Sequence, residues 1–221
     1  MPSRTRRLSD RILPLVLSLI AAAVSLDASA TSSADELVRQ AQAHERANEP
    51  DMAARRYTEA LWIDPAHATA WLGLGALRLK LDDAGEAEHV YTAALEHMPT
   101  LTLALEGRAR ARWRLGQHRA AEIDMERYTA ASGDAAATRE LAKWYASDGR
   151  LPAELALWRR LLAFAMDRSD WSGVREARTV VLALTVLVDG ADPASAPMEP
   201  DATRLALAAI ARRCFGSPRS P

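Results

Sequence analysis

The chain has 221 residues, of which 49% are hydrophobic, 26% charged and only 5% aromatic, and its formal net charge is −1. This composition excludes a wholly disordered chain and lacks the basic excess of nucleic-acid-binding proteins. The single cysteine excludes an intrachain disulfide and a cysteine-based zinc site. The 46 alanines, beside few aromatic residues, indicate helices that pack closely through small side chains.

Residues 1–30 have the order of a secretory signal peptide. Four arginines precede an apolar run over residues 13–24, and Ala28-Ser29-Ala30 supplies a small-x-small cleavage site. We expect cleavage after Ala30 and a periplasmic or secreted protein with no stable membrane span. The alternative is an uncleaved anchor, although the run is shorter than the roughly 20 residues that cross a bilayer. The pair Arg6-Arg7 leaves both general and twin-arginine export open.

A period of 34 residues organises the middle of the chain. Ala53, Tyr57, Ala60 and Pro65 recur as Ala87, Tyr91, Ala94 and Pro99. Residues 68–101 also carry Trp71, Leu74 and Gly75 at repeat positions 4, 7 and 8. This pattern resembles the tetratricopeptide repeat (TPR) family, and Arg78 at position 11 is the one departure among its eight characteristic positions. The resemblance implies two antiparallel helices per repeat, stacked into an all-α solenoid.

The resemblance places four helical hairpins along the chain. The repeats cover residues 34–67, 68–101, 102–135 and 135–168, the last of them degenerate. It implies small residues at positions 8 and 20, where the two helices of a repeat cross, and a bulky residue at position 24. In the fourth repeat Ala142, Tyr145, Gly149 and Trp158 fall at positions 8, 11, 15 and 24.

The remainder predicts a C-terminal helical extension. Residues 170–189 have helical apolar spacing, with Asp170 or Ser172 as the N-cap. The alternative is a strand, because several of these residues are β-branched. Residues 190–200 carry three prolines and predict an exposed linker, and residues 201–214 predict a helix that caps the end of the stack.

No catalytic constellation is recognisable. There is no nucleophile elbow and no phosphate-binding glycine loop, and His44-Glu45 lacks the second histidine of a zinc-protease helix because residue 48 is asparagine. We therefore expect no enzyme, no cofactor and no metal. The pair Asp82-Asp83 is expected to complement a helix N-terminus. Cys214 could be buried under the cap, form an intermolecular disulfide or act as a nucleophile.

In TPR-like proteins the first helix of each repeat lines a concave groove, mainly through positions 2, 5, 9, 12 and 13. The resemblance thus implies an apolar strip that runs into a basic, tryptophan-bearing patch. The candidate residues are Leu72, Leu79, Lys80, Arg110, Trp113, Arg114, Arg139 and Lys143. They could hold the apolar groups and carboxylates of a peptide. The alternative is that the arginines are solvated or paired with Glu106 and neighbouring acids.

The expected function is an exported scaffold that binds a peptide or an envelope protein. The subfamily that clamps chaperone C-termini is not indicated, because Val38 and Gln42 stand where it has lysine and asparagine. Two alternatives stay open. The chain could be a subunit of an envelope polymer-processing or export complex, or it could self-associate through an unsealed solenoid end.

Overall fold

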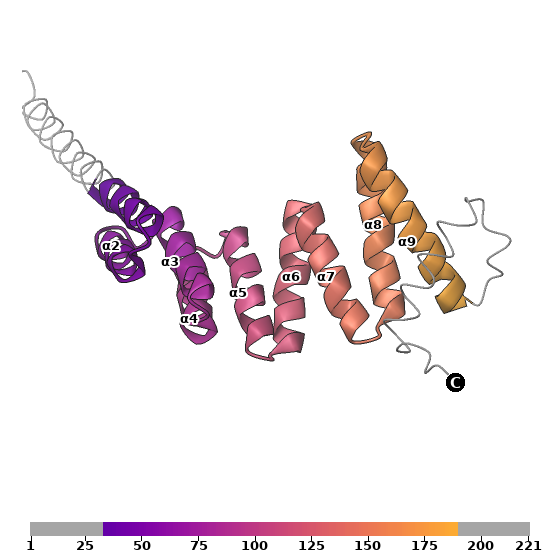
Figure 1. The fold of residues 1–221 in the computed structure, drawn as a ribbon, viewed down its shortest axis with the longest axis horizontal. Coiled ribbons are helices and arrows are strands. Elements are labelled where there is room, and N and C mark those ends of the chain that lie inside the picture. Colours follow the sequence, from indigo (N-terminus) through magenta and orange to yellow (C-terminus); the bar gives the residue numbers. More distant parts are fainter. Residues whose placement is uncertain (1–32, 190–221) are drawn as a thin grey trace, which may run out of the picture. The chain divides into compact units, whose positions relative to one another are not determined.

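The computed structural model describes residues 33–189, and the predicted signal peptide, linker and capping helix, with Cys214, lie outside them. Helices and short turns make up this part of the chain, which confirms the all-α class (Figure 1). Residues 33–46 are helical. The helices that follow are α2 (Pro50–Ile63), α3 (Ala68–Lys80), α4 (Ala84–His97), α5 (Thr102–Arg114), α6 (His118–Ser132), α7 (Ala135–Ser147), α8 (Leu151–Asp167) and α9 (Trp171–Asp189). None of the helices between residues 33 and 189 has the length and apolar character needed to cross a membrane.

The described residues fall into two compact units. Unit 1 ends at Gln117 and unit 2 begins at His118. Within each unit, helices that are consecutive in the chain pack against one another (Figure 1). The boundary lies inside the predicted third repeat, residues 102–135, so its first helix belongs to unit 1 and its second to unit 2.

The turn inside each repeat has the same backbone conformation. Asn48, Asp82, Gly116 and Gly149 occupy position 15 of the four predicted repeats, and their φ angles are 59°, 62°, 75° and 69°. Left-handed residues of this kind end helices, and glycine, asparagine and aspartate adopt the conformation at the lowest cost. The residue type at position 15 therefore fixes where each first helix ends.

Side-chain caps start several of the helices. Asp83 accepts a hydrogen bond from the Glu86 amide at 3.3 Å, as expected of the acidic pair before α4. Asp134 accepts from the amides of Ala136 and Ala137 at 2.7 and 3.0 Å. Asp170 accepts from the Gly173 amide at 3.0 Å, so α9 begins at one of the two N-caps considered for this helix. The β-branched residues of α9 are helical, and three of them, Val180, Val181 and Val188, pack on α8.

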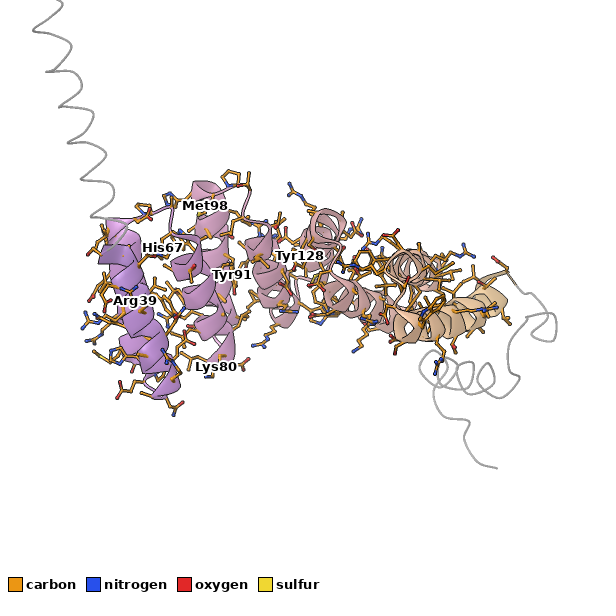
Figure 2. All side chains as sticks on the ribbon, turned by 90° about the horizontal axis from the view of Figure 1, so that it is seen from above. Arg39, His67, Lys80, Tyr91, Met98 and Tyr128 are labelled. Atoms are coloured by element: carbon orange, nitrogen blue, oxygen red, sulfur yellow. The ribbon has the colours of Figure 1, made fainter. Side chains whose placement is uncertain are left out.

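Unit 1 is held together by tyrosines that insert against glycines. Tyr91, labelled in Figure 2, lies on α4. Its ring is so close to Gly75 on α3 that an added Cβ would be 2.5 Å from Tyr91 Cζ. A Cβ on Gly107 of α5 would come closer still to the same ring. Tyr57 on α2 meets Gly73 of α3 in the same way, with a Cβ at 2.5 Å. The two contacts of Tyr91 set how closely α3 and α5 approach.

The helix crossings of unit 1 are made by alanines. The predicted crossing residues Ala41, Ala53 and Ala87 are fully buried, and so are Ala60 and Ala94 at position 27. A methyl group is the largest side chain that lets two helix backbones approach this closely without separating them. Some of the 46 alanines are therefore explained by position, because they lie where two helices cross.

Unit 2 contains a charged network beside its buried alanines Ala121 and Ala142. Glu122 on α6 is 2% exposed and accepts a hydrogen bond at 2.6 Å from Arg150, next to the start of α8. The Arg150 guanidinium lies 4.3 Å from the centroid of the Tyr145 ring, and the Tyr145 hydroxyl donates to Glu126. Burial and the hydrogen bond to Glu126 raise the pKa of Tyr145. The network connects α6, α7 and the turn before α8.

We expect Gly107→Ala to destabilise the protein by about 1–3 kcal/mol, because the added methyl group would overlap the Tyr91 ring. Urea unfolding followed by circular dichroism measures this loss. The matched control is Gly85→Ala on α4, where an added Cβ meets nothing within 4 Å. That change should be neutral or stabilising by up to about 1 kcal/mol. Equal destabilisation by both variants would contradict the tyrosine–glycine contact.

Candidate functional site

The candidate site in unit 1 is the surface formed by α3 and α5, which we call the α3–α5 face. The two helices contact each other in the structure. The six predicted residues of unit 1 divide between them. α3 contributes Leu72, Leu79 and Lys80, and α5 contributes Arg110, Trp113 and Arg114. Val38, at an equivalent position of the first repeat, is buried in the core and is no part of this face.

The apolar side chains of the α3–α5 face pack on the hydrophobic core on one side. Leu72 and Leu79 are half-buried and pack against the cluster that contains Ala87 and Tyr91. Trp113 is also half-buried. Side chains held on one side by the core and open to solvent on the other need little ordering when a partner binds. The apolar strip is therefore suited to receive apolar side chains.

The structure brings Arg114 against the end of α3. Its Nη1 donates a hydrogen bond to the Leu79 carbonyl oxygen at 2.5 Å and lies 3.6 Å from Asp82 Oδ1. Carbonyl groups at a helix C-terminus carry partial negative charge, so an arginine here is favourable. This contact joins position 13 of the third repeat to the turn of the second, and the sequence pattern did not indicate it.

Two other candidate arginines have acidic partners. Arg110 pairs with Glu106 at 2.9 Å, one turn away on α5. Arg139 on α7 pairs with Glu176 on α9 at 2.9 Å. Both arginines are thus paired with acids, and Glu106 is the partner that the sequence had suggested as an alternative to peptide binding. Because the arginines remain partly exposed, each pair contributes about 0–1 kcal/mol, and a partner's carboxylate can replace the internal acid at small cost.

The lysines differ from the arginines. Lys80 and Lys143 are exposed and make no ion pair within residues 33–189. A cavity that Lys80 borders has a volume of only about 30 Å³ and is shared with Glu45 and Leu77. A space of this size holds about one water molecule. The α3–α5 face would therefore contact a partner through its surface.

Arg139 and Lys143 lie on α7 and so belong to unit 2. The candidate site in unit 1 therefore does not include them. Both lie on α7, at repeat positions 5 and 9. Leu72 and Arg110 of the α3–α5 face stand at the same positions in their own repeats. The structure thus groups six of the eight predicted residues on two adjacent helices and the other two on α7.

The tyrosine beneath the α3–α5 face is electrostatically coupled to it. Burial raises the pKa of Tyr91 to about 12; Arg110 opposes this shift and Glu106 adds to it. Sequence reasoning missed the position-6 glycines, Gly73 and Gly107, that admit the tyrosine rings. Their own separation of 34 residues was the available signal. Among the described residues, no three histidine, aspartate or glutamate side chains are grouped so that they could hold a metal ion.

The comparisons with known proteins concern the fold. No protein-family model matches the chain, and no curated protein matches it. The structure is similar to that of MamA, residues 41 to the end, from Desulfovibrio magneticus RS-1, with a TM-score of 0.58 and 18% identity over 81% of this chain and 96% of that one. It is also similar to YrrB, a TPR protein, with a TM-score of 0.56 and 17% identity over 82% and 86% of the two chains.

A third similar structure is the first TPR domain of human RPAP3, with a TM-score of 0.50 and 22% identity. It covers 56% of this chain and 96% of that domain. These likenesses, together with the helical hairpins described above, establish a TPR-like α-solenoid fold.

We expect the stability of the protein to fall between about pH 10 and pH 12, partly through Tyr91. An unfolded tyrosine has a pKa of about 10, and that of folded Tyr91 is about 12. A raised folded pKa means that its contribution is complete below the unfolded pKa and is lost as pH rises through the folded one. Chemical unfolding across this pH range measures the loss, which Tyr91→Phe should reduce. An unchanged pH profile in that variant would contradict the assignment.

Proposed function

We propose that this protein is an exported, non-enzymatic scaffold whose α3–α5 face binds a peptide segment of another envelope protein. The observation that carries the proposal is the composition of that face. Half-exposed Leu72, Leu79 and Trp113 stand on two adjacent helices beside Lys80, Arg110 and Arg114. Aromatic and arginine side chains on a rigid base are the usual energetic centres of protein interfaces.

The expected partner is an amphipathic segment with acidic residues. Its apolar side chains would lie on Leu72, Leu79 and Trp113. Its carboxylates would be held by Lys80 and by the arginines, whose exposed internal pairs are weak enough to exchange. An arginine accepts a carboxylate through two parallel hydrogen bonds, which gives the interaction direction as well as strength. On α7, Arg139 and Lys143 are proposed contacts of unit 2 for acidic groups.

Two further observations support this proposal. YrrB, which is similar in fold, is described as a TPR protein with an unusual peptide-binding site. The order of basic, apolar and small residues at the N-terminus supports export, and with it a partner in the cell envelope.

The proposal is tested with a face variant that combines Lys80→Glu, Trp113→Ala and Arg114→Glu. Affinity capture from envelope extract with the unchanged protein would first identify the partner, and binding of the matching synthetic peptide would then be measured by calorimetry. We expect the face variant to bind that peptide at least about tenfold more weakly, since it loses an aromatic anchor and reverses two charges. Circular dichroism confirms that the variant is folded.

The matched control is Arg55→Glu, which reverses an exposed charge on α2, outside the α3–α5 face. It should leave peptide binding unchanged. If the folded face variant captures the same partners in undiminished amounts, the α3–α5 face does not bind them.

A further inference from the structure

Unit 2 contains a cavity of about 300 Å³ between α6, α7 and α8. It is bordered by Thr129, Ala130, Gly133, Thr138, Arg160, Leu161 and Phe164. Thr129, Thr138 and Leu161 are buried, at 2%, 3% and 6% exposed, whereas Ala130 and Arg160 are exposed, so the cavity opens to solvent. No residue of the α3–α5 face takes part in it.

The second repeat shows what fills the corresponding space there. Trp71 at position 4 donates its indole N–H to the Pro65 carbonyl at 2.8 Å. Its ring stacks on His97 at position 30, with centroids 5.7 Å apart and an interplanar angle of 19°. The indole thus occupies the space between the preceding turn and the second helix of its own repeat.

The fourth repeat keeps the aromatic partner but not the tryptophan. Thr138 and Phe164 lie 67 residues after Trp71 and His97, and so at the same positions 4 and 30. Gly133 stands at position 32 of the preceding repeat, as Pro65 does for Trp71. The side chain of threonine is much smaller than indole, and the cavity takes the place of the missing ring system. The Phe164 ring borders it, and Arg168 lies over that ring at 4.8 Å from the centroid.

The polar groups of the cavity favour an anion. The hydroxyl groups of Thr129 and Thr138 donate hydrogen bonds to the carbonyl oxygens of Glu126 and Asp134, respectively, so neither hydroxyl proton is left for a ligand. Arg160 Nη2 donates to Thr138 Oγ1 at 3.3 Å, and Arg160 pairs with no carboxylate between residues 33 and 189. Its remaining guanidinium N–H groups are the donors that a bound carboxylate would accept from.

We propose that this cavity binds a ligand group made of an aromatic ring and a carboxylate. The ring lies against Phe164 and Leu161, in the position that the Trp71 ring has against His97 in the second repeat. The carboxylate accepts hydrogen bonds from Arg160. A cavity of about 150 Å³ holds benzene, so about 300 Å³ accommodates a bicyclic ring. This site is independent of the proposed α3–α5 face in both location and ligand class.

The test measures binding of indole-3-acetate and of indole to the purified protein by ligand-observed NMR and calorimetry. We expect both to bind, and indole-3-acetate more tightly. Arg160→Gln should weaken indole-3-acetate about tenfold, by loss of a charged hydrogen bond, and leave indole unchanged. The control Arg159→Gln, the exposed neighbour on the same helix, should change neither. A peptide that ends in tryptophan offers the same chemistry, and comparison with it shows whether a free acid or a chain end is preferred.

A second variant tests the ring position directly. Thr138→Trp restores the residue of the second repeat, and we expect a higher melting temperature and no binding of either probe. The proposal is overturned if the unchanged protein binds neither probe, or if a folded Thr138→Trp protein still binds both. The Arg160→Gln variant changes no core residue and so should fold normally. If it binds indole-3-acetate as tightly as the unchanged protein does, the proposal is overturned as well.

Discussion

The insertion of a tyrosine ring between glycines of successive first helices is the contact on which unit 1 depends. Tyr91 lies between Gly75 of its own repeat and Gly107 of the next, so one side chain sets the separation of α3 and α5. Because interiors are close-packed, a single added methyl group at either glycine must displace the ring. The α3–α5 face exists at its observed spacing because this contact is tight.

Unit 2 departs from this arrangement, and its departures have chemical consequences. Thr138 replaces the tryptophan of position 4, and a cavity bordered by Phe164 and Arg160 results. Glu122 is buried but compensated by Arg150, as a buried carboxylate must be. We propose that the regular repeats of unit 1 present a surface to a protein partner, and that the irregular ones of unit 2 leave a solvent-open cavity for a small group. The two proposals rest on different parts of the same fold.

The features that could be predicted from the sequence are those set by residue types within one repeat. The 34-residue period predicted the hairpins, and the residue types at position 15 suit the left-handed turns because few residues adopt that conformation cheaply. It did not predict the pairing of Arg114 with the end of α3, since that depends on the distance between helices of different repeats. Thr138 stands at position 4 of the fourth repeat, where the second repeat has Trp71. The repeat pattern did not predict the cavity there, because that depends on how the neighbouring side chains pack.

The central claim, that the Tyr91 ring is what Gly107 makes room for, is tested most directly by a double-mutant cycle. The free energy of unfolding is measured for Gly107→Ala, for Tyr91→Leu and for the two together. We predict that Gly107→Ala is destabilising beside tyrosine but nearly neutral, or slightly stabilising, once leucine has replaced the ring, because only helix propensity then remains. The same loss in both backgrounds would contradict the account.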